Sequence, residues 1–132
     1  MNFNKFVDLS RRMIDRPDSK YKHFSFIVCG QTIFSIGVNN TTKTHPLAQK
    51  YGHRFASTHS EINALGRFPY AIRLLRNYDM VNVRLNKKGI VRLAKPCIHC
   101  QQLLMAFHIQ NIYYSTNSGD FEILKNKVDA WT

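Results

Sequence analysis

The sequence predicts a layered α/β domain, in which helices cover a β-sheet. Helical and strand-like apolar patterns alternate through the second half of the chain, which is typical of this class. A pair of β-rich segments joined by a short turn precedes them and supplies further strands. The chain has 132 residues, of which 44% are hydrophobic, enough to bury one core. We therefore predict a single domain over residues 1–132.

The N-terminal third is predicted to form a helix and a β-hairpin. Over residues 3–14, apolar side chains recur at helical spacing, and Pro17 ends the pattern. The segments HFSFIVC (23–29) and TIFSIGV (32–38) are rich in β-branched and aromatic residues, and a short turn containing glycine separates them. The polar segment 39–57 contains proline and glycine, and its length indicates a functional loop.

The second half is predicted to alternate between helices and strands. Helical patterns cover residues 58–68 and 97–109, and strand patterns cover 80–86 and 111–116. The segment FEILKNKV (121–128) fits either a last helix or a last strand. The order is therefore αββαβαβ before this final segment, which is the order expected of a sheet covered by helices.

Charge and cysteine content restrict the class of protein. The net charge of +11 attracts anions such as the phosphates of a nucleotide or a nucleic acid, although it also fits a role in solubility alone. Three cysteines with one close pair make a poor disulfide framework and favour a reducing compartment. The sequence contains neither a long apolar segment nor a signal-peptide core. We therefore expect a soluble, cytoplasmic protein without a membrane partner.

Two predicted helix starts carry residues that suit chemistry. One begins with His59 and Glu61, and the other contains the pair Cys97 and Cys100. The cysteine pair fits a redox dithiol, half of a structural zinc knuckle or part of a catalytic metal site. A redox dithiol does not account for His59 and Glu61. Because side chains tilt toward the N-terminus of a helix, two helices that meet start-first would form a metal site with these ligands.

The number of ligands separates the two kinds of metal site. His59, Cys97 and Cys100 make three, whereas a structural zinc site uses four and a catalytic site keeps the fourth position for water. Spacing argues against His99 and His108 as a fourth ligand. It does not exclude three others, of which the cysteine is expected in the core: His45, His53 and Cys29.

The two motifs together resemble the signature of zinc-dependent deaminases. His-x-Glu at 59–61 and Pro-Cys-x-x-Cys at 96–100 occur in the expected order. The chain resembles the cytidine and deoxycytidylate deaminase superfamily over roughly residues 20–122. This resemblance implies a three-layer α/β/α domain with a mixed central sheet of about five strands. It also implies a homo-oligomer, because members of this superfamily often assemble.

The resemblance also implies roles for particular residues. His59, Cys97 and Cys100 would bind Zn²⁺, and Glu61 would transfer protons between water and the base. Taken without its neighbours, Glu61 also fits a capping box that begins at Thr58.

Three further residues are expected to contact substrate. By the same resemblance, Asn39 follows the second strand and would contact sugar or base, and the backbone at Ser60 would line the pocket. Ser60 stands where the family commonly has alanine. His45 lies in the long loop, where it would meet an anionic substrate group, although a plain loop role fits it as well.

The implied activity is the hydrolytic deamination of a cytosine nucleoside or nucleotide. Cytidine, deoxycytidine or dCMP would give the uracil product and ammonia. Two alternatives draw on the charge of +11. One is a deaminase of cytosine or adenine in single-stranded DNA or RNA, and the other is a non-catalytic, zinc-stabilised domain that binds nucleic acid.

Overall fold

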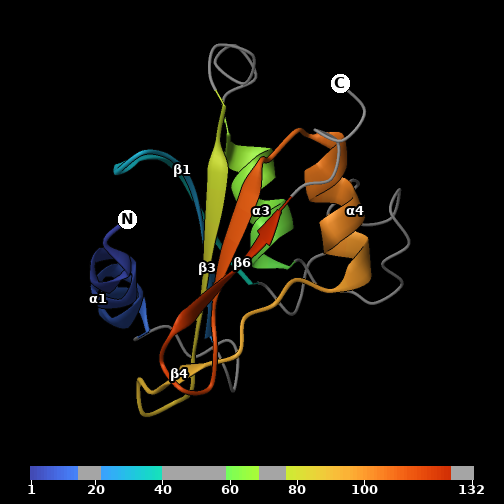
Figure 1. Ribbon diagram of the computed structural model, residues 1–132. Helices are drawn as coiled ribbons and strands as arrows, with labels where there is room; N and C mark the ends of the chain where they lie inside the picture. Colours follow the sequence, from blue (N-terminus) through green and yellow to red (C-terminus); the bar gives the residue numbers. More distant parts are fainter. Residues whose placement is uncertain (15–21, 40–58, 69–76, 126–132) are drawn as a thin grey trace.

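The computed structural model describes residues 1–14, 22–39, 59–68 and 77–125. They form a β-sheet with one helix on one face and two on the other (Figure 1). The three helices are α1 (Phe3–Met13), α3 (Ser60–Arg67) and α4 (Ile98–Ala106). The predicted three-layer α/β/α architecture is confirmed.

The central sheet is mixed. Its strands are β1 (Lys22–Cys29), β2 (Thr32–Val38), β3 (Asp79–Leu85), β4 (Val91–Arg92), β5 (Asn111–Ser115) and β6 (Phe121–Lys125). They follow the order β2-β1-β3-β5-β6, with β4 paired to β3 outside this path. The β3–β5 pair is parallel, as expected for strands joined through a helix, and the other pairs are antiparallel.

The strand predictions are confirmed with two additions. The predicted hairpin is the β1–β2 pair, and the ambiguous C-terminal segment forms strand β6 over its first five residues. Strand β4 was not predicted, because two residues are too short to show an alternating pattern. Across the described residues, no helix combines the length and apolar character needed to cross a membrane.

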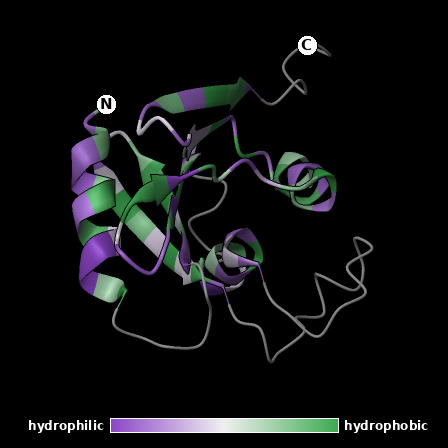
Figure 2. Cartoon of the chain, turned by 90° about the horizontal axis from the view of Figure 1, so that it is seen from below, coloured by the Kyte–Doolittle hydropathy of each residue, from purple (hydrophilic) through white to green (hydrophobic). Residues whose placement is uncertain are grey.

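Each face of the sheet has its own hydrophobic core. On one face, Phe6 and Val7 of α1 pack against alternate residues of β1 and β3. Figure 2 shows that α1 turns its hydrophobic side toward the sheet and its hydrophilic side outward. On the other face, α3 and α4 pack against the intervening residues of the same strands, among them Ile27 and Met80. Polar residues in these strands therefore face a helix layer on either side.

Helix α3 lies unusually close to strand β2. A Cβ atom added to Gly37 would overlap the carbonyl oxygen of Ser60 and the backbone of Ala64. The backbone N–H of Val38 donates to Oδ1 of Asn63, at 3.1 Å. The missing side chain at Gly37 thus lets the first turn of α3 lie directly against the sheet.

Helix α4 is shorter than predicted. It runs over residues 98–106, with Cys97 as its N-cap, whereas the sequence predicted residues 97–109. The helix ends because His108 adopts a left-handed backbone conformation, with φ of 59°. The next residue, Ile109, is buried in the core, and its apolar character extended the helical pattern in the sequence.

Candidate metal centre and active site

The structure brings together His59, Cys97 and Cys100. Each residue lies at or near the N-terminus of a helix, His59 as the N-cap of α3 and the cysteines at the start of α4. Nδ1 of His59 lies 3.7 Å from Sγ of Cys97 and 3.3 Å from Sγ of Cys100. The three ligand atoms lie within 4.8 Å of one another. The two helices therefore meet start-first, as the sequence predicted.

This geometry fits a zinc ion. With usual Zn–N and Zn–S bond lengths, two ligands of a tetrahedral site are about 3.5 Å apart. The distances from His59 Nδ1 to the two sulfur atoms, 3.7 and 3.3 Å, are close to this value. One imidazole and two thiolates also form a donor set that zinc prefers. These three residues would hold the ion and leave a fourth position for another ligand.

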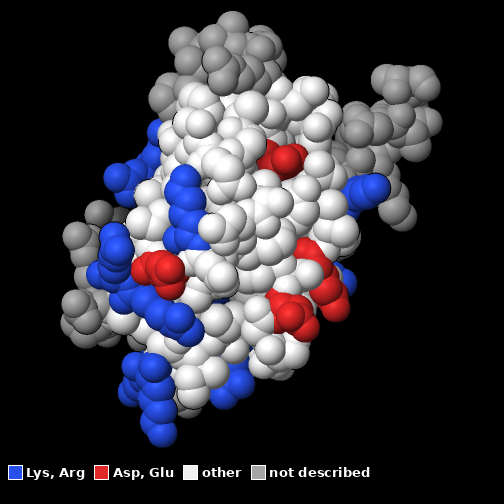
Figure 3. Space-filling view, turned by 60° about the vertical axis from the view of Figure 1, so that its left-hand side comes forward, with Lys and Arg blue, Asp and Glu red and all other residues white. Residues whose placement is uncertain are grey.

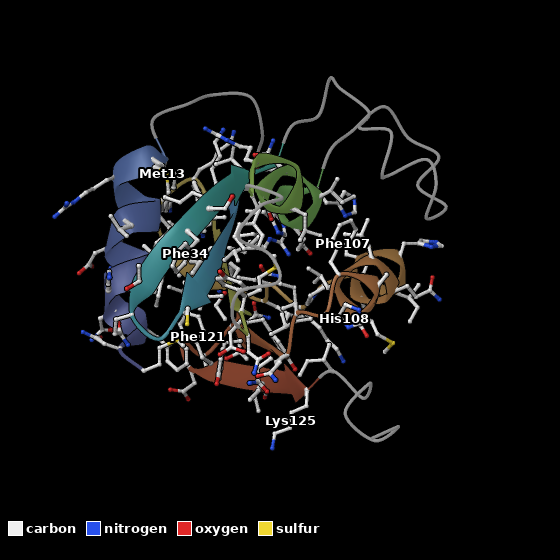
Figure 4. The ribbon with its side chains drawn as sticks, turned by 90° about the horizontal axis from the view of Figure 1, so that it is seen from above. Met13, Phe34, Phe107, His108, Phe121 and Lys125 are labelled. Carbon is white, nitrogen blue, oxygen red and sulfur yellow. The ribbon has the colours of Figure 1, made fainter. Side chains whose placement is uncertain are left out.

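The candidates for a fourth protein ligand do not join this group where the structure describes them. Cys29 packs beside the core on the α3/α4 face, and the described part of the chain adds no other histidine, cysteine or carboxylate to the cluster. His108 lies just past the C-terminal end of α4 (Figure 4). The cysteines lie at the start of the same helix. The two remaining candidates, His45 and His53, lie outside the described residues.

The surroundings of Cys97 favour its thiolate form. Hydrogen bonds from the Cys100 thiol and then from His59 lower the pKa of Cys97 to about 3, despite partial burial. The backbone N–H of Cys100 also lies 3.5 Å from the Cys97 sulfur, at the positive end of the helix dipole. The bond to Cys97 and burial raise the pKa of Cys100, and the bond to Cys97 raises the pKa of His59. In the metal-free protein, these pKa shifts favour protonated Cys100 and protonated His59 beside the Cys97 thiolate.

Glu61 is buried beside this cluster. Its side chain is 5% exposed, and burial raises the pKa of its carboxyl group. Helix α3 begins at Ser60 with His59 as its N-cap, so Glu61 is the second helical residue and not the third, as a capping box requires. The capping-box interpretation is therefore wrong. A buried carboxyl group with a raised pKa suits proton transfer.

Two polar residues that were not predicted from the sequence are connected to Glu61 through Ser60. Ser25 of β1 and Asn82 of β3 are direct cross-strand partners, and both are buried. The Ser25 hydroxyl donates to Oδ1 of Asn82 at 2.7 Å and lies 2.8 Å from the Ser60 hydroxyl. Ser25 and Asn82 alternate with apolar residues along their strands, a pattern that usually indicates side chains facing solvent. The predicted layer of helices on both faces was the signal that these polar side chains are buried.

The expected substrate residues have mixed outcomes. Asn39 accepts a hydrogen bond from the His23 backbone N–H through Oδ1, at 3.1 Å, and so fixes the end of the β1–β2 pair. His23 itself lies close to the site, because burial, Arg84 and His59 together lower its pKa to about 4. The hydroxyl of Ser60 contacts protein groups, and His45 lies outside the described residues. Substrate contact by Asn39, Ser60 and His45 stays a prediction.

The fold and the His–Cys–Cys cluster define an α/β domain with a group of zinc-type ligands. The chain belongs to the family described as the cytidine and deoxycytidylate deaminase zinc-binding region, which matches residues 3–116. The match begins before residue 20, where the sequence motifs had placed the start of the resemblance, and includes α1. No curated protein sequence matches the chain.

Solved structures of deaminases share this fold. A cytidine deaminase from Burkholderia pseudomallei superposes with a TM-score of 0.58 at 15% identity, covering 96% of this chain and 94% of that chain. A dCMP deaminase from the cyanophage S-TIM5, in complex with dCMP and dUMP, gives 0.55 at 14% identity, covering 88% and 85%. A cytidine deaminase from Mycobacterium leprae gives 0.53 at 16% identity, covering 96% and 95%. At such identities the likeness shows the fold.

Proposed function

We propose that this protein hydrolyses the exocyclic amino group of a cytosine nucleoside or nucleotide. Water and the cytosine ring give the uracil product and ammonia. One observation carries the proposal: the buried Glu61 lies beside three converging zinc-type ligands, His59, Cys97 and Cys100. Membership of the deaminase family supports this class of reaction.

The three ligands and Glu61 divide the chemistry between them. His59 would bind Zn²⁺ through Nδ1, and the two cysteines would bind it through Sγ. Bound there, the ion supplies the Lewis acidity that makes water a nucleophile at neutral pH. Glu61 would accept the proton that water loses and pass it to the ring nitrogen, and would then transfer a second proton, from the hydroxyl group added to the ring carbon, to the departing amine. Its burial favours the protonated carboxyl group that this second step requires.

The substrate is proposed to be a free nucleoside or nucleotide. The structural neighbours are named as cytidine and dCMP deaminases, and one of them holds dCMP and dUMP. Asn39, His45 and the backbone at Ser60 are proposed to line the pocket in which the substrate binds. The single domain over residues 1–132 and its homo-oligomeric assembly belong to the same proposal.

The basic residues on the α1 side do not favour a polynucleotide substrate. Figure 3 views the molecule from the α1 side, where lysine and arginine side chains gather toward one edge. Arg11 and Arg12 of α1 are exposed on this side of the sheet, whereas the metal ligands lie on the α3/α4 side. These charges therefore do not extend the candidate site into a track for a nucleic-acid strand.

Ammonia release by the purified, zinc-containing protein tests the proposal. We expect turnover of at least one of cytidine, deoxycytidine and dCMP. Turnover of a single-stranded oligonucleotide alone, weakened steeply by salt, would instead favour the polynucleotide alternative. No turnover of any substrate by protein that holds one zinc per chain would leave the non-catalytic zinc domain as the better description.

A further inference from the structure

A continuous chain of buried polar groups runs from Glu61 through the sheet. Oε1 of Glu61 lies 3.0 Å from the Ser60 hydroxyl, which in turn lies 2.8 Å from the Ser25 hydroxyl. Each hydroxyl has one proton, so with a protonated carboxyl group Glu61 donates to Ser60, and Ser60 donates to Ser25. Ser25 donates to Oδ1 of Asn82 at 2.7 Å. The amide of Asn82 in turn donates to the carbonyl oxygen of Ala94, at 3.5 Å. The chain therefore has an acidic side chain at one end and a backbone carbonyl at the other.

The side chains that form this polar chain are shielded from solvent. Ser25 is 0% exposed, and Ser60 and Asn82 are each 2% exposed. In such surroundings a polar group that loses its partner is not compensated by water, so each member depends on its neighbours. These contacts are therefore more persistent than hydrogen bonds of similar length at the surface.

The chain connects the two halves of the candidate site. Ser60 and Glu61 belong to the first turn of α3, which begins beside His59. At the other end, Ala94 lies three residues before Cys97 in the segment that leads into α4. Ser25 and Asn82 lie between them on paired strands of the central sheet. The sheet thus holds the carboxyl group and the cysteine segment in register through side-chain contacts.

The geometry points to Ser60, Ser25 and Asn82 as positioning residues for Glu61. A glutamate side chain has several rotatable bonds, and ordering it for reaction costs conformational entropy. Here one carboxyl oxygen is held by a serine that is itself held by the sheet. The inference rests on the proposed function only for the reaction that Glu61 performs. The connected contacts themselves are a property of the fold.

Alanine variants of the two serines test the effect on turnover. In zinc-loaded protein, we expect Ser60→Ala to lower kcat about tenfold while KM changes little, because a positioning contact acts on the reacting geometry. Ser25→Ala should have a similar but smaller effect. A double variant should lose little more than Ser60→Ala, since Ser25 acts through Ser60. Independent, multiplying effects of the two substitutions would overturn the inference.

Ser35→Ala is the matched control. Ser35 is also a buried strand serine, 7% exposed, and its hydroxyl donates to the Ala64 carbonyl oxygen of the same helix at 2.7 Å. No described contact connects it to Glu61. The control should be destabilised to a similar degree and keep its kcat. Equal losses of kcat in Ser35→Ala and Ser25→Ala would show that α3 packing alone explains the effect, and the positioning role would be wrong.

A double-mutant cycle separates this inference from the proposed function. The urea denaturation midpoints of Ser25→Ala, Glu61→Gln and the double variant are compared with that of the parent protein. This measurement does not require any enzymatic turnover. A connected chain predicts non-additive shifts, although Ser25 and Glu61 belong to different elements. If the shifts are non-additive and no substrate is turned over, coupling through the polar chain is supported and the deaminase proposal fails. If the shifts are additive, the chain does not couple these residues and the inference fails, even in an active enzyme.

Discussion

The Cys100 sulfur lies 3.3 Å from Nδ1 of His59, although 41 residues separate them in the sequence. This contact joins the starts of α3 and α4 on one face of the sheet. Both helices contribute to the same hydrophobic core, so the contact depends on the packing of that whole face. Metal binding at this point is therefore expected to stabilise the fold as well as the site.

Removal of zinc should lower the melting temperature. A ligand that binds the folded state alone stabilises it by about 4 kcal/mol at a thousand times its Kd. We expect a chelator to lower Tm and added zinc to restore it. Replacement of Cys97 by alanine should remove this response. Full zinc stoichiometry and an unchanged zinc-dependent rise of Tm in Cys97→Ala would contradict the ligand set.

Binding of zinc should weaken as the pH falls. Protons on His59 and Cys100 must leave before these atoms can coordinate a cation. Isothermal titration in two buffers of different ionisation enthalpy would measure the protons released. We expect net release at neutral pH. Zinc uptake without release of protons would show that a different set of atoms binds the metal.

Replacement of Glu61 by glutamine should abolish turnover without loss of zinc. General acid–base catalysis contributes about 10²–10⁴ in rate, and the amide transfers no proton. Activity close to that of the parent protein would exclude the proposed role of Glu61. Zinc content and the far-UV spectrum provide the controls for metal binding and fold.

The same variant should also change the pH dependence of stability. Burial raises the pKa of Glu61 above its unfolded value, so the folded state retains its proton to higher pH. This stabilising contribution is complete below the unfolded pKa and is lost as the pH rises through the folded pKa. We expect metal-free Glu61→Gln to lose less stability than the parent protein as the pH rises from the unfolded pKa of Glu61 through its folded pKa. Parallel urea-denaturation profiles would contradict a buried, proton-retaining Glu61.

His23 should contribute a pH dependence of the opposite sign. Burial and then Arg84 and His59 lower its pKa from 6.5 to about 4, so the unfolded state binds the extra proton between these values. Stability should therefore rise with pH across this window and be complete above it, by an upper limit of roughly 3 kcal/mol. Urea denaturation of metal-free protein should show a shallower rise in His23→Gln. An unchanged slope would place His23 in a more solvated setting.

Replacement of Gly37 by alanine should displace the start of α3. Its Cβ would meet the backbone of Ser60 and Ala64, which cannot rotate away as a side chain can. Overpacking of this kind costs about 1–3 kcal/mol, and movement of His59 should also weaken zinc binding. Denaturation and zinc affinity measure the two effects. Thr32→Ala, at an exposed position of the same strand, is the control and should change neither. Parent-like zinc affinity in Gly37→Ala would show that α3 tolerates the shift.

The order of the main elements follows from the sequence alone, because helical and strand periods are local properties of the chain. The motifs at 59–61 and 96–100, and the family that they resemble, can also be recognised from the sequence. By contrast, the end of α4 was not predictable from apolar spacing. Ile109 fits the helical pattern but reaches the core only after His108 has broken the helix.

Tertiary structure decided which residues surround Glu61. The contact between Ser25 and Asn82 requires the exact register of β1 against β3, and the contact with Ser60 requires the close approach of α3 that Gly37 permits. A shift of one residue in that register would turn Ser25 to the other face of the sheet. Sequence spacing therefore determined which groups are available for the metal site. Strand register and helix packing, which join residues distant in the chain, determined how the carboxyl group is held.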